Sequence, residues 1–476
     1  MHHIVKSLCC ALGACLLLAA SSAWSQDPPH YTQLTFPELS DWPHVEPQTF
    51  FLPCKAQLLV LEDHELPLVR VTIEVRTGEV LVPRGLEGLV PVMGEALRSG
   101  GSKSYGPDEL NTVLENKAAD LTVSGDFDST RVTLNVLRQD LESLLEVLGD
   151  LLAHPRFPQD KIALAQKQVL TNIARRNDNQ QQVAFREFKR MIYGPGSVYG
   201  RLPQVKSVQH IDRHDVLSFY EQGFTGANMF IGVVGDVQPE KVKNLMTKYL
   251  GSIPTGEQTD LHFPPVKTHE AKKQKFIHMS GVNQVSILMG HKGGLRQDED
   301  YAALQIMNSI LSQGFSSRLF QNLRTRMGLA YSVYGRYGSN VFYPGIFLAG
   351  LKTKSSNLVR AAQALEKQIL ALHKEGVTKE EVQRAKEEFL NSLVFRYETP
   401  QEILDRQVYY AYRDMPEDSF ERLVREVKDV QVQDVNRVAA EHLHPDRLQM
   451  LMVGNRDMVQ EQLAEFPDME VVELEE

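Results

Sequence analysis

Residues 71–76 read Val71-Thr72-Ile73-Glu74-Val75-Arg76, an alternating run typical of a strand, and a helix-like run follows from Leu86 to Leu97. About 214 residues later the same pair of runs recurs, with the strand-like Val285-Ser286-Ile287-Leu288-Met289 before a helix-like run from Tyr301 to Leu311. The recurrence indicates that the chain contains an internal duplication.

The two halves continue in the same order: an alternating strand, a helix with apolar residues three and four apart, and a closing strand that ends in glycine. These elements are expected at 130–137, 141–152 and 229–235 in the first half, and at 345–351, 358–372 and 448–454 in the second. Two unrelated domains that share an element order by chance would not keep a nearly constant offset. We therefore predict two homologous α+β domains, each a mainly antiparallel sheet backed by helices.

The chain length and one change in composition suggest the domain boundaries. A chain of 476 residues is longer than one hydrophobic core usually serves. The stretch from Ser252 to Lys275 is rich in Pro, His, Thr and Lys and is typical of a linker. We expect an N-terminal domain over 45–251, a linker over 252–275 and a C-terminal domain over 276–470.

The first 25 residues have the pattern of a secretory signal peptide. Lys6 supplies a positive charge, an apolar stretch runs from Leu8 to Ala20, and Ala23-Trp24-Ser25 offers a cleavage site before Gln26. A lipoprotein signal ending at Cys15 is the alternative, although most of the apolar stretch would then follow the cysteine. No later segment has the 18 apolar residues of a membrane-spanning helix.

Charge and cysteine usage narrow the class of protein further. A net charge of -10 argues against nucleic acid or an anionic membrane as the main partner. Cleavage after Ser25 would leave Cys54 alone, so no internal disulfide could form, and this lone thiol is more typical of a core than of a nucleophile. An exported chain of this size without disulfides favours the bacterial periplasm.

One stretch of the second half is more specific. It contains Gly314-Phe315-Ser316-Ser317-Arg318-Leu319-Phe320, then Leu323-Arg324, then Gly328-Leu329-Ala330-Tyr331-Ser332. Together these residues resemble the C-terminal domain of the pitrilysin/insulinase family of inverzincin metallopeptidases, and the duplicated halves agree with it. The resemblance covers nearly all of the mature chain and implies a half-shell architecture.

Active members of that family carry the zinc motif H-x-x-E-H on the first helix of the N-terminal half. Two histidines four residues apart bind Zn²⁺, the glutamate acts as the general base, and a distant glutamate completes the ligand set. In this chain, Gly88-Leu89-Val90 leads into Pro91 and Val92-Met93-Gly94-Glu95. The first histidine position is thus Pro91, the base position Gly94 and the second histidine position Glu95.

The distant ligand position is also changed. Alignment to the family places Ala165 at the ligand glutamate and Asn172 at a later acid, and the stretch from Ile162 to Ile173 contains no acid at all. Proline, glycine and alanine side chains can neither bind a cation nor move a proton. No second H-x-x-E-H or H-E-x-x-H occurs in the chain. We therefore expect no metal in this chain, and whether it takes part in any enzyme activity depends on a partner.

A second feature of the family is retained. Its members use an arginine and a tyrosine seven residues apart in the C-terminal half to orient the peptide and to stabilise the developing oxyanion. Arg324 and Tyr331 match that pair in spacing and context. The alternative is structural: Arg324 could form a helix salt bridge and Tyr331 could be a core aromatic.

A chain that lacks the zinc ligands but keeps this pair resembles one of the two subunit types found in the two-chain members of the family. The resemblance implies a heterodimer with a homologous zinc-bearing subunit, to which Arg324 and Tyr331 are supplied in trans. Unfolded or extended peptides would be the substrates, held at a sheet edge by main-chain hydrogen bonds. Two alternatives stay open: a scaffold or peptide-binding subunit without turnover, and an autonomous activity of another kind.

The remaining polar clusters are more typical of structure than of chemistry. His442-Leu443-His444 is expected at a helix-to-strand junction as surface or loop residues, with a metal site as the alternative. Asp63-His64-Glu65 precedes the first strand pair without an obvious distal partner, and Lys272-Lys273-Gln274-Lys275 is expected to be a solvated charge run.

Overall fold

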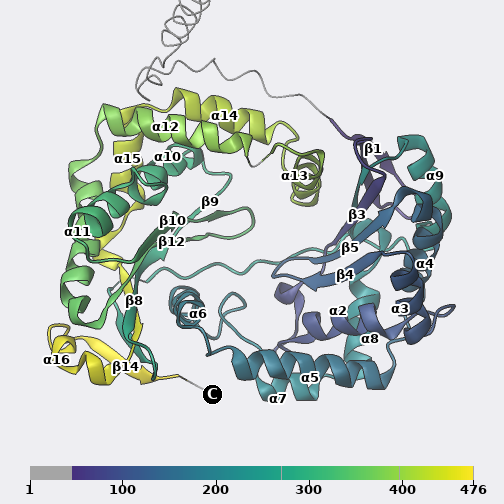
Figure 1. Cartoon of the computed structure of the whole chain (residues 1–476), viewed down its shortest axis with the longest axis horizontal. Helices are drawn as coiled ribbons and strands as arrows, with labels where there is room; N and C mark the ends of the chain where they lie inside the picture. The colour runs from purple at the N-terminus through teal and green to yellow at the C-terminus, as the bar shows by residue number, and fades with distance from the viewer. Residues whose placement is uncertain (1–45, 270, 396, 475–476) are drawn as a thin grey trace, which may run out of the picture. The chain divides into compact units, whose positions relative to one another are not determined.

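The computed structural model describes residues 46–474, apart from 270 and 396. The proposed signal peptide, with Cys15 and both candidate processing sites, lies outside these residues. Two six-stranded sheets, one from each half of the chain, organise the described part, and helices cover them (Figure 1). None of its helices is both long and apolar enough to cross a bilayer.

The first sheet has the strand order β1-β2-β6-β3-β5-β4. Its strands are β1 (Gln48–Phe51), β2 (Gln57–Glu62), β3 (Leu68–Val75), β4 (Asp120–Gly125), β5 (Thr130–Leu137) and β6 (Met229–Gly235). All neighbours pair antiparallel except β2 and β6, which run parallel. The sheet is mainly antiparallel, as predicted, and β4 is one of its two edges.

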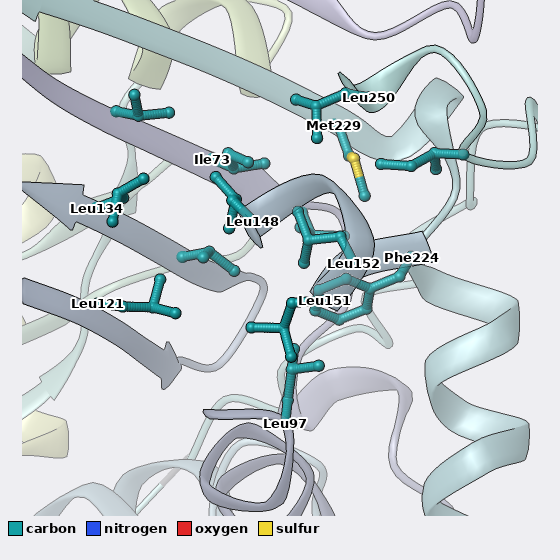
Figure 2. Close-up of a cluster of buried hydrophobic side chains, with 14 of the residues drawn as sticks. Ile73, Leu97, Leu121, Leu134, Leu148, Leu151, Leu152, Phe224, Met229 and Leu250 are labelled. Carbon is teal, nitrogen blue, oxygen red and sulfur yellow. The ribbon is translucent and has the colours of Figure 1, made fainter. Parts of the chain in front are cut away.

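Helices cover one face of this sheet. They are α2 (Leu89–Gly100), α3 (Pro107–Asn116), α4 (Leu141–Ala153), α5 (Gln159–Arg175), α7 (Val205–His210), α8 (Arg213–Gly223) and α9 (Pro239–Leu250). The side chains of α4 at three- and four-residue spacing are buried against Ile73, Leu134 and Met229 of the strands, as Figure 2 shows. Burying these apolar faces is the main force that holds helices to sheet.

The second sheet has the strand order β10-β12-β8-β13-β7-β14. Its strands are β7 (Gln274–His278), β8 (Gln284–Lys292), β10 (Ser332–Tyr337), β12 (Ile346–Lys354), β13 (Gln449–Gly454) and β14 (Met469–Glu473). β7 pairs parallel with both β13 and β14, and the other pairs are antiparallel. The short strands β9 (Gly294–Leu295) and β11 (Ser339–Asn340) form a separate parallel pair.

The helices of the second half repeat the first in outline. They are α10 (Tyr301–Ser312), α11 (Leu358–Glu375), α12 (Lys379–Val394), α13 (Pro400–Tyr412), α14 (Ser419–Asp429), α15 (Val432–His442) and α16 (Gln460–Leu463). α10 packs on β10, and α11 packs on β12 and β8. The duplicated elements predicted from the sequence are present in both halves, so the two-domain α+β fold is confirmed.

Two helices are exchanged between the halves. α6 (Gln180–Tyr193) belongs to the first half, yet its Val183, Ala184 and Phe188 are buried against apolar side chains of β7, β8 and β13. The side-chain amide of Gln180 donates to the carbonyl oxygens of Gln284 and Val453, both at 2.8 Å. A helix of the first half therefore covers the second sheet.

α13 does the reverse. Its Leu404, Val408 and Tyr412 are buried against β2 and β6 of the first sheet. β6 has a glycine, Gly232, at the contact, and a Cβ there would lie 2.8 Å from a methyl group of Val408. The absence of a side chain at Gly232 lets the helix approach the strand backbone.

The second exchanged helix is also anchored by charge. Arg413, directly after α13, donates to Asp128 Oδ2 at 2.8 Å, and the hydroxyl of Tyr412 donates to the carbonyl oxygen of Asp128 at 2.6 Å. Arg76 donates to the carbonyl oxygen of Tyr412 at 2.6 Å. These buried and half-buried contacts link β3 and the β4–β5 turn to α13.

The described residues of the stretch predicted as a linker form no helix or strand before β7 begins at Gln274, but part of the stretch is packed. Leu261 is buried with the residues around α13. The ring of Phe263 stacks on that of Phe342, with centroids 4.8 Å apart. Tyr199 donates to the carbonyl oxygen of Pro264 at 2.6 Å. These contacts hold the stretch against both halves.

Candidate functional site

α2 and α5 pack against each other, as the zinc site of active family members requires, but the side chains at the ligand positions do not form a ligand set. Pro91 is half-buried in the first turn of α2, Gly94 is buried, and Glu95 is exposed. Ala165 is buried on the face of α5 that enters the core. The base and three ligand positions thus provide one carboxylate and no imidazole.

The residues around Ala165 have taken structural roles. The amide of Gln166 donates to the carbonyl oxygens of Val208 and Ile211, at 2.8 and 2.9 Å, and so joins α5 to the end of α7. Asn172 is exposed on the last turns of α5. Neither residue adds a metal ligand to the α2 surface.

The edge strand β4 lies against α2. A Cβ at Gly94 would lie 3.5 Å from the carbonyl oxygen of Val123, and one at Gly125 would be 2.0 Å from a methyl group of Val90. The position that the resemblance assigns to the general base therefore faces the backbone of β4. In the described chain β4 pairs only with β5, so its other edge has unpaired backbone groups.

The segment that leads into α2 contains a carboxyl group with a perturbed pKa. Arg201 donates to the carbonyl oxygens of Glu79 and Val82, and its Nη1 lies 3.7 Å from Glu87 Oε1. Burial raises the pKa of Glu79 to about 7, and the charge of Arg201 opposes that rise.

The segment from Gln313 to Tyr331 in the second half is fixed at its start by side chains. Arg318 forms a bidentate pair with Glu381, with both N–O distances 2.7 Å, and also donates to the carbonyl oxygen of Gly376. Ser316 donates to Glu388 Oε1 at 2.6 Å. These contacts attach the segment to the first turn and the middle of α12 and to the loop before this helix.

Residues Phe320–Arg326 form a π-helical stretch, a rare conformation that is frequent at functional sites. Arg324 is exposed on this stretch, and its guanidinium lies over the ring of Phe320 with 4.8 Å to the centroid. Phe320 in turn packs edge to face on Phe315, which is 76% exposed. Within the described residues Arg324 forms no ion pair, so the salt-bridge alternative does not describe it.

Tyr331 is 75% exposed directly before β10, and its backbone N–H donates to the carbonyl oxygen of Lys352 at 2.9 Å. It is therefore not a core aromatic. The N–H of Leu329 donates to the carbonyl oxygen of Leu323 at 2.9 Å, which brings the chain just before Tyr331 close to the residue that precedes Arg324. The structure thus keeps both residues on one closed segment with their side chains in solvent.

The aromatic pair beneath Arg324 was not predicted. The sequence contained a signal for it, since Phe315 and Phe320 flank the serine pair of the most specific family stretch. The close spacing of Phe320 and Arg324 on one helical face could have suggested a cation–π contact.

The other polar clusters have partners. His64 Nδ1 lies 2.6 Å from Asp236 Oδ1, and Arg138 donates to the other oxygen of Asp236 at 2.7 Å. Asp236 is therefore the distal partner that could not be identified from the sequence. The hydrogen bond to Asp236 raises the pKa of His64. Cys54 is buried, as expected of a core thiol.

Two protein-family models match consecutive parts of the chain. The model described as insulinase, peptidase family M16, matches residues 59–199, and the model of the peptidase M16 inactive domain matches residues 210–389. The chain belongs to the insulinase family, peptidase family M16. With no histidine at its ligand positions, it is of the family's non-catalytic type.

Curated relatives of this M16 protein are distant in sequence. A non-peptidase homologue, YmxG of Helicobacter pylori, is 24% identical over 405 residues, which is 84% of this chain and 92% of the relative. The uncharacterised zinc protease YmxG of Bacillus subtilis is also 24% identical, over 64% of this chain and 73% of its own length.

Solved structures agree on the fold. A peptidase M16 inactive domain from Pseudomonas fluorescens superposes with a TM-score of 0.77 at 22% identity, covering 86% of this chain and 98% of that one. The first half of the periplasmic protease PqqL from Escherichia coli gives a TM-score of 0.74 at 16% identity, covering 88% and 93%. At these identities the likeness concerns the fold alone.

Proposed function

We propose that this M16 protein is the non-catalytic subunit of a periplasmic heterodimeric zinc peptidase and supplies Arg324 and Tyr331 to its partner's active site. One observation carries the proposal: both side chains are exposed on a segment that is otherwise firmly anchored. An arginine held over an aromatic ring rather than by a carboxylate keeps its N–H donors available for another group.

The chemistry of peptide hydrolysis gives these groups a role. Attack on the scissile carbonyl builds negative charge on its oxygen, and donors already in position stabilise that charge. In the proposed complex the guanidinium of Arg324 and the phenol of Tyr331 are such donors. They also hold the peptide in the orientation needed for attack.

The rest of the machinery would belong to a homologous zinc-bearing subunit. That subunit would provide the H-x-x-E-H motif, the metal and the water, and its glutamate would take the proton. The substrate would be an unfolded or extended peptide that adds to a sheet edge through its main chain. The signal-like N-terminus of the sequence supports the periplasm as the compartment.

A scaffold or peptide-binding subunit without turnover is the second candidate, and the edge of β4 favours it. This strand lies beside a zinc-less α2 and has an unpaired backbone edge in the described chain, so it could hold a peptide that is never cut. In that case the surface of this chain's own first half would be the functional one.

The two candidates differ in what Arg324 does. Mixing the chain with a zinc-bearing homologue from the same genome should give a complex that hydrolyses an unfolded peptide faster than the homologue alone. Arg324→Ala should assemble normally and lose most of that gain. Arg326→Ala, an exposed arginine two residues away, is the matched control and should keep it.

The comparison requires equal concentrations of assembled complex, measured by size exclusion, because a variant that fails to dimerise would mimic a catalytic defect. If Arg324→Ala assembles and supports full turnover, the trans-supply proposal fails and the scaffold candidate gains.

A further inference from the structure

A small pocket with four histidines lies at one end of the second sheet. Its volume is about 150 Å³, and residues from the linker stretch, β8, β10 and the α15–β13 connection line it. The lining residues are Thr268, His269, His291, Lys292, Gly293, Tyr337, His442, His444, Arg447 and Gln449.

Among the described lining residues the permanent charges are both positive. Lys292 and Arg447 are half-buried, and none of the described lining residues carries a carboxylate. Lys292 donates to Thr268 Oγ1 at 2.6 Å, which uses one of its three protons. Arg447 donates through Nε to Asp446, which is exposed outside the lining, and its terminal nitrogens make no hydrogen bond among the described residues.

The histidines differ in how many of their ring nitrogens are free to bind a ligand. Buried His291 uses both ring nitrogens, since Nδ1 lies 2.7 Å from the carbonyl oxygen of Lys292 and Nε2 accepts from the backbone N–H of His444. His442 Nε2 lies 2.7 Å from Asp300 Oδ2, and its Nδ1 faces the hydroxyl of Tyr337 at 3.4 Å. The ring of His444 makes no hydrogen bond within the described residues.

A metal ion does not fit this lining. Within the described residues, the only group of three possible ligands with their atoms within 4.8 Å of one another is Asp300, Glu441 and His442. Both of its carboxylates already bind Arg437, whose Nη1 lies 3.1 Å from Asp300 and 2.9 Å from Glu441. A guanidinium occupies the position that a cation would need, and Lys292 and Arg447 would repel a metal inside the pocket.

An acceptor completes the site. Gln449 is fully buried, and its side-chain N–H₂ donates to the carbonyl oxygens of Ala271 and Arg447, both at 2.9 Å, which fixes the orientation of the amide. Its Oε1 is buried and accepts no hydrogen bond from the described residues. A buried unpaired acceptor is costly, so it favours a ligand that carries a proton to donate.

We propose that this pocket binds a small doubly charged oxyanion with a hydroxyl group, of which hydrogenphosphate is the simplest. Lys292 and Arg447 balance its two negative charges, Thr268 and the free ring of His444 offer further contacts, and the P–OH donates to Gln449. Sulfate has the same shape and charge but no proton for Gln449. Acetate has only one charge.

The site is separate from the Arg324–Tyr331 segment. Tyr337 ends β10 at the pocket, whereas Tyr331 directly precedes the other end of the same strand. Six residues of strand extend about 20 Å. The inference therefore stands whether or not the chain serves a peptidase.

Calorimetric titration of the purified chain with inorganic phosphate tests the proposal, at an ionic strength held constant with sodium chloride. One phosphate should bind per chain, with sulfate bound roughly tenfold more weakly and acetate not measurably. Lys292→Met and Arg447→Met should each weaken phosphate binding roughly tenfold or more. Lys354→Met is the matched control, because Lys354 is an exposed lysine at the far end of the same sheet, and it should change nothing.

Circular dichroism checks that each variant is folded. If one of the two pocket variants does not fold, the other alone is sufficient for the test. The proposal is overturned if phosphate binding does not saturate, if both pocket variants bind phosphate as the unmodified chain does, or if sulfate binds equally well.

Discussion

Two regions of this chain differ in what they retain of the family's motifs. The surface of α2 lacks the motif residues, whereas the segment from Gln313 to Tyr331 keeps them. On α2 the positions assigned to chemistry hold Pro91, Gly94 and Glu95, of which Gly94 is buried against β4. In the second segment Arg324 and Tyr331 remain exposed above an anchored backbone. The first surface now serves packing, while the second keeps polar and aromatic groups that packing does not use.

The buried residues of α2 and the exposed residues Arg324 and Tyr331 should contribute to different properties, the first to stability and the second to function. A buried glycine or alanine contributes through close contact, so it resists replacement by larger or charged groups. An exposed arginine or tyrosine contributes little to folding, because its contacts with water are nearly the same in the unfolded chain. Perturbing each surface should therefore affect a different measurement.

The largest effect is expected for Tyr331→Phe in the complex with a zinc-bearing subunit. Removing one donor from a developing oxyanion costs about 2.7–4 kcal/mol, or roughly a hundred- to thousandfold in turnover. Turnover at saturating peptide and matched complex concentration measures it. Tyr397→Phe, elsewhere in the second half, should stay near the unmodified rate; equal losses in both would contradict a specific role for Tyr331.

Gly94→Glu should show the opposite profile. It places a carboxylate in the contact between α2 and β4 with no metal to pair with, and we expect a loss of roughly 2–4 kcal/mol in the free energy of unfolding. Arg324→Ala should change that free energy by less than about 0.5 kcal/mol. Denaturant unfolding of both variants measures the difference, and similar values would erase the contrast between the surfaces.

Glu79 provides a pH-dependent test next to α2. Burial raises its pKa from 4.5 to about 7, so the folded chain binds this proton more tightly than the unfolded chain. Its contribution to stability is therefore greatest below about pH 4.5 and is lost as the pH rises through about 7. Glu79→Gln should be more stable than the unmodified chain by about 1–3 kcal/mol at pH 8 and nearly equal at about pH 4. Unfolding at both pH values measures it; a difference independent of pH would refute it.

The smallest effect is expected from metal removal, which should leave the isolated chain unchanged. The isolated chain should hold no stoichiometric zinc, and a chelator should leave its thermal transition unchanged, since α2 and α5 provide no histidine pair. Elemental analysis of the purified chain measures the metal. One zinc per chain, together with chelator-sensitive peptide hydrolysis, would show that the ligand set had been misplaced.

The sequence predicted the paired strands and helices well because each element's pattern has a local period. The predicted strands at 130–137 and 229–235 are β5 and β6, and the predicted helix from Tyr301 to Leu311 is α10. The exchange of α6 and α13 was not predicted. An amphipathic pattern gives the apolar face of a helix but not the sheet that this face will cover.

The same limit applied to the sites. The ligand positions could be assigned because the zinc motif is a fixed spacing on one helix, and the Arg324–Tyr331 pair has a fixed spacing too. The histidine pocket combines residues from 268 to 449, and their spacing in the sequence gives no sign of convergence. Only the β8–β13 pairing and the return of the linker stretch bring them together.

The exchange of α6 and α13 has a consequence for how the chain unfolds. One face of each sheet is covered by a helix that comes from the other half of the chain. Separating the halves would expose Leu404 and Val408 on one side and Val183 and Phe188 on the other, together with the strands beneath them. The two halves should therefore melt in a single cooperative transition, and a chain cut between them should stay associated as two fragments that neither refold nor remain soluble apart.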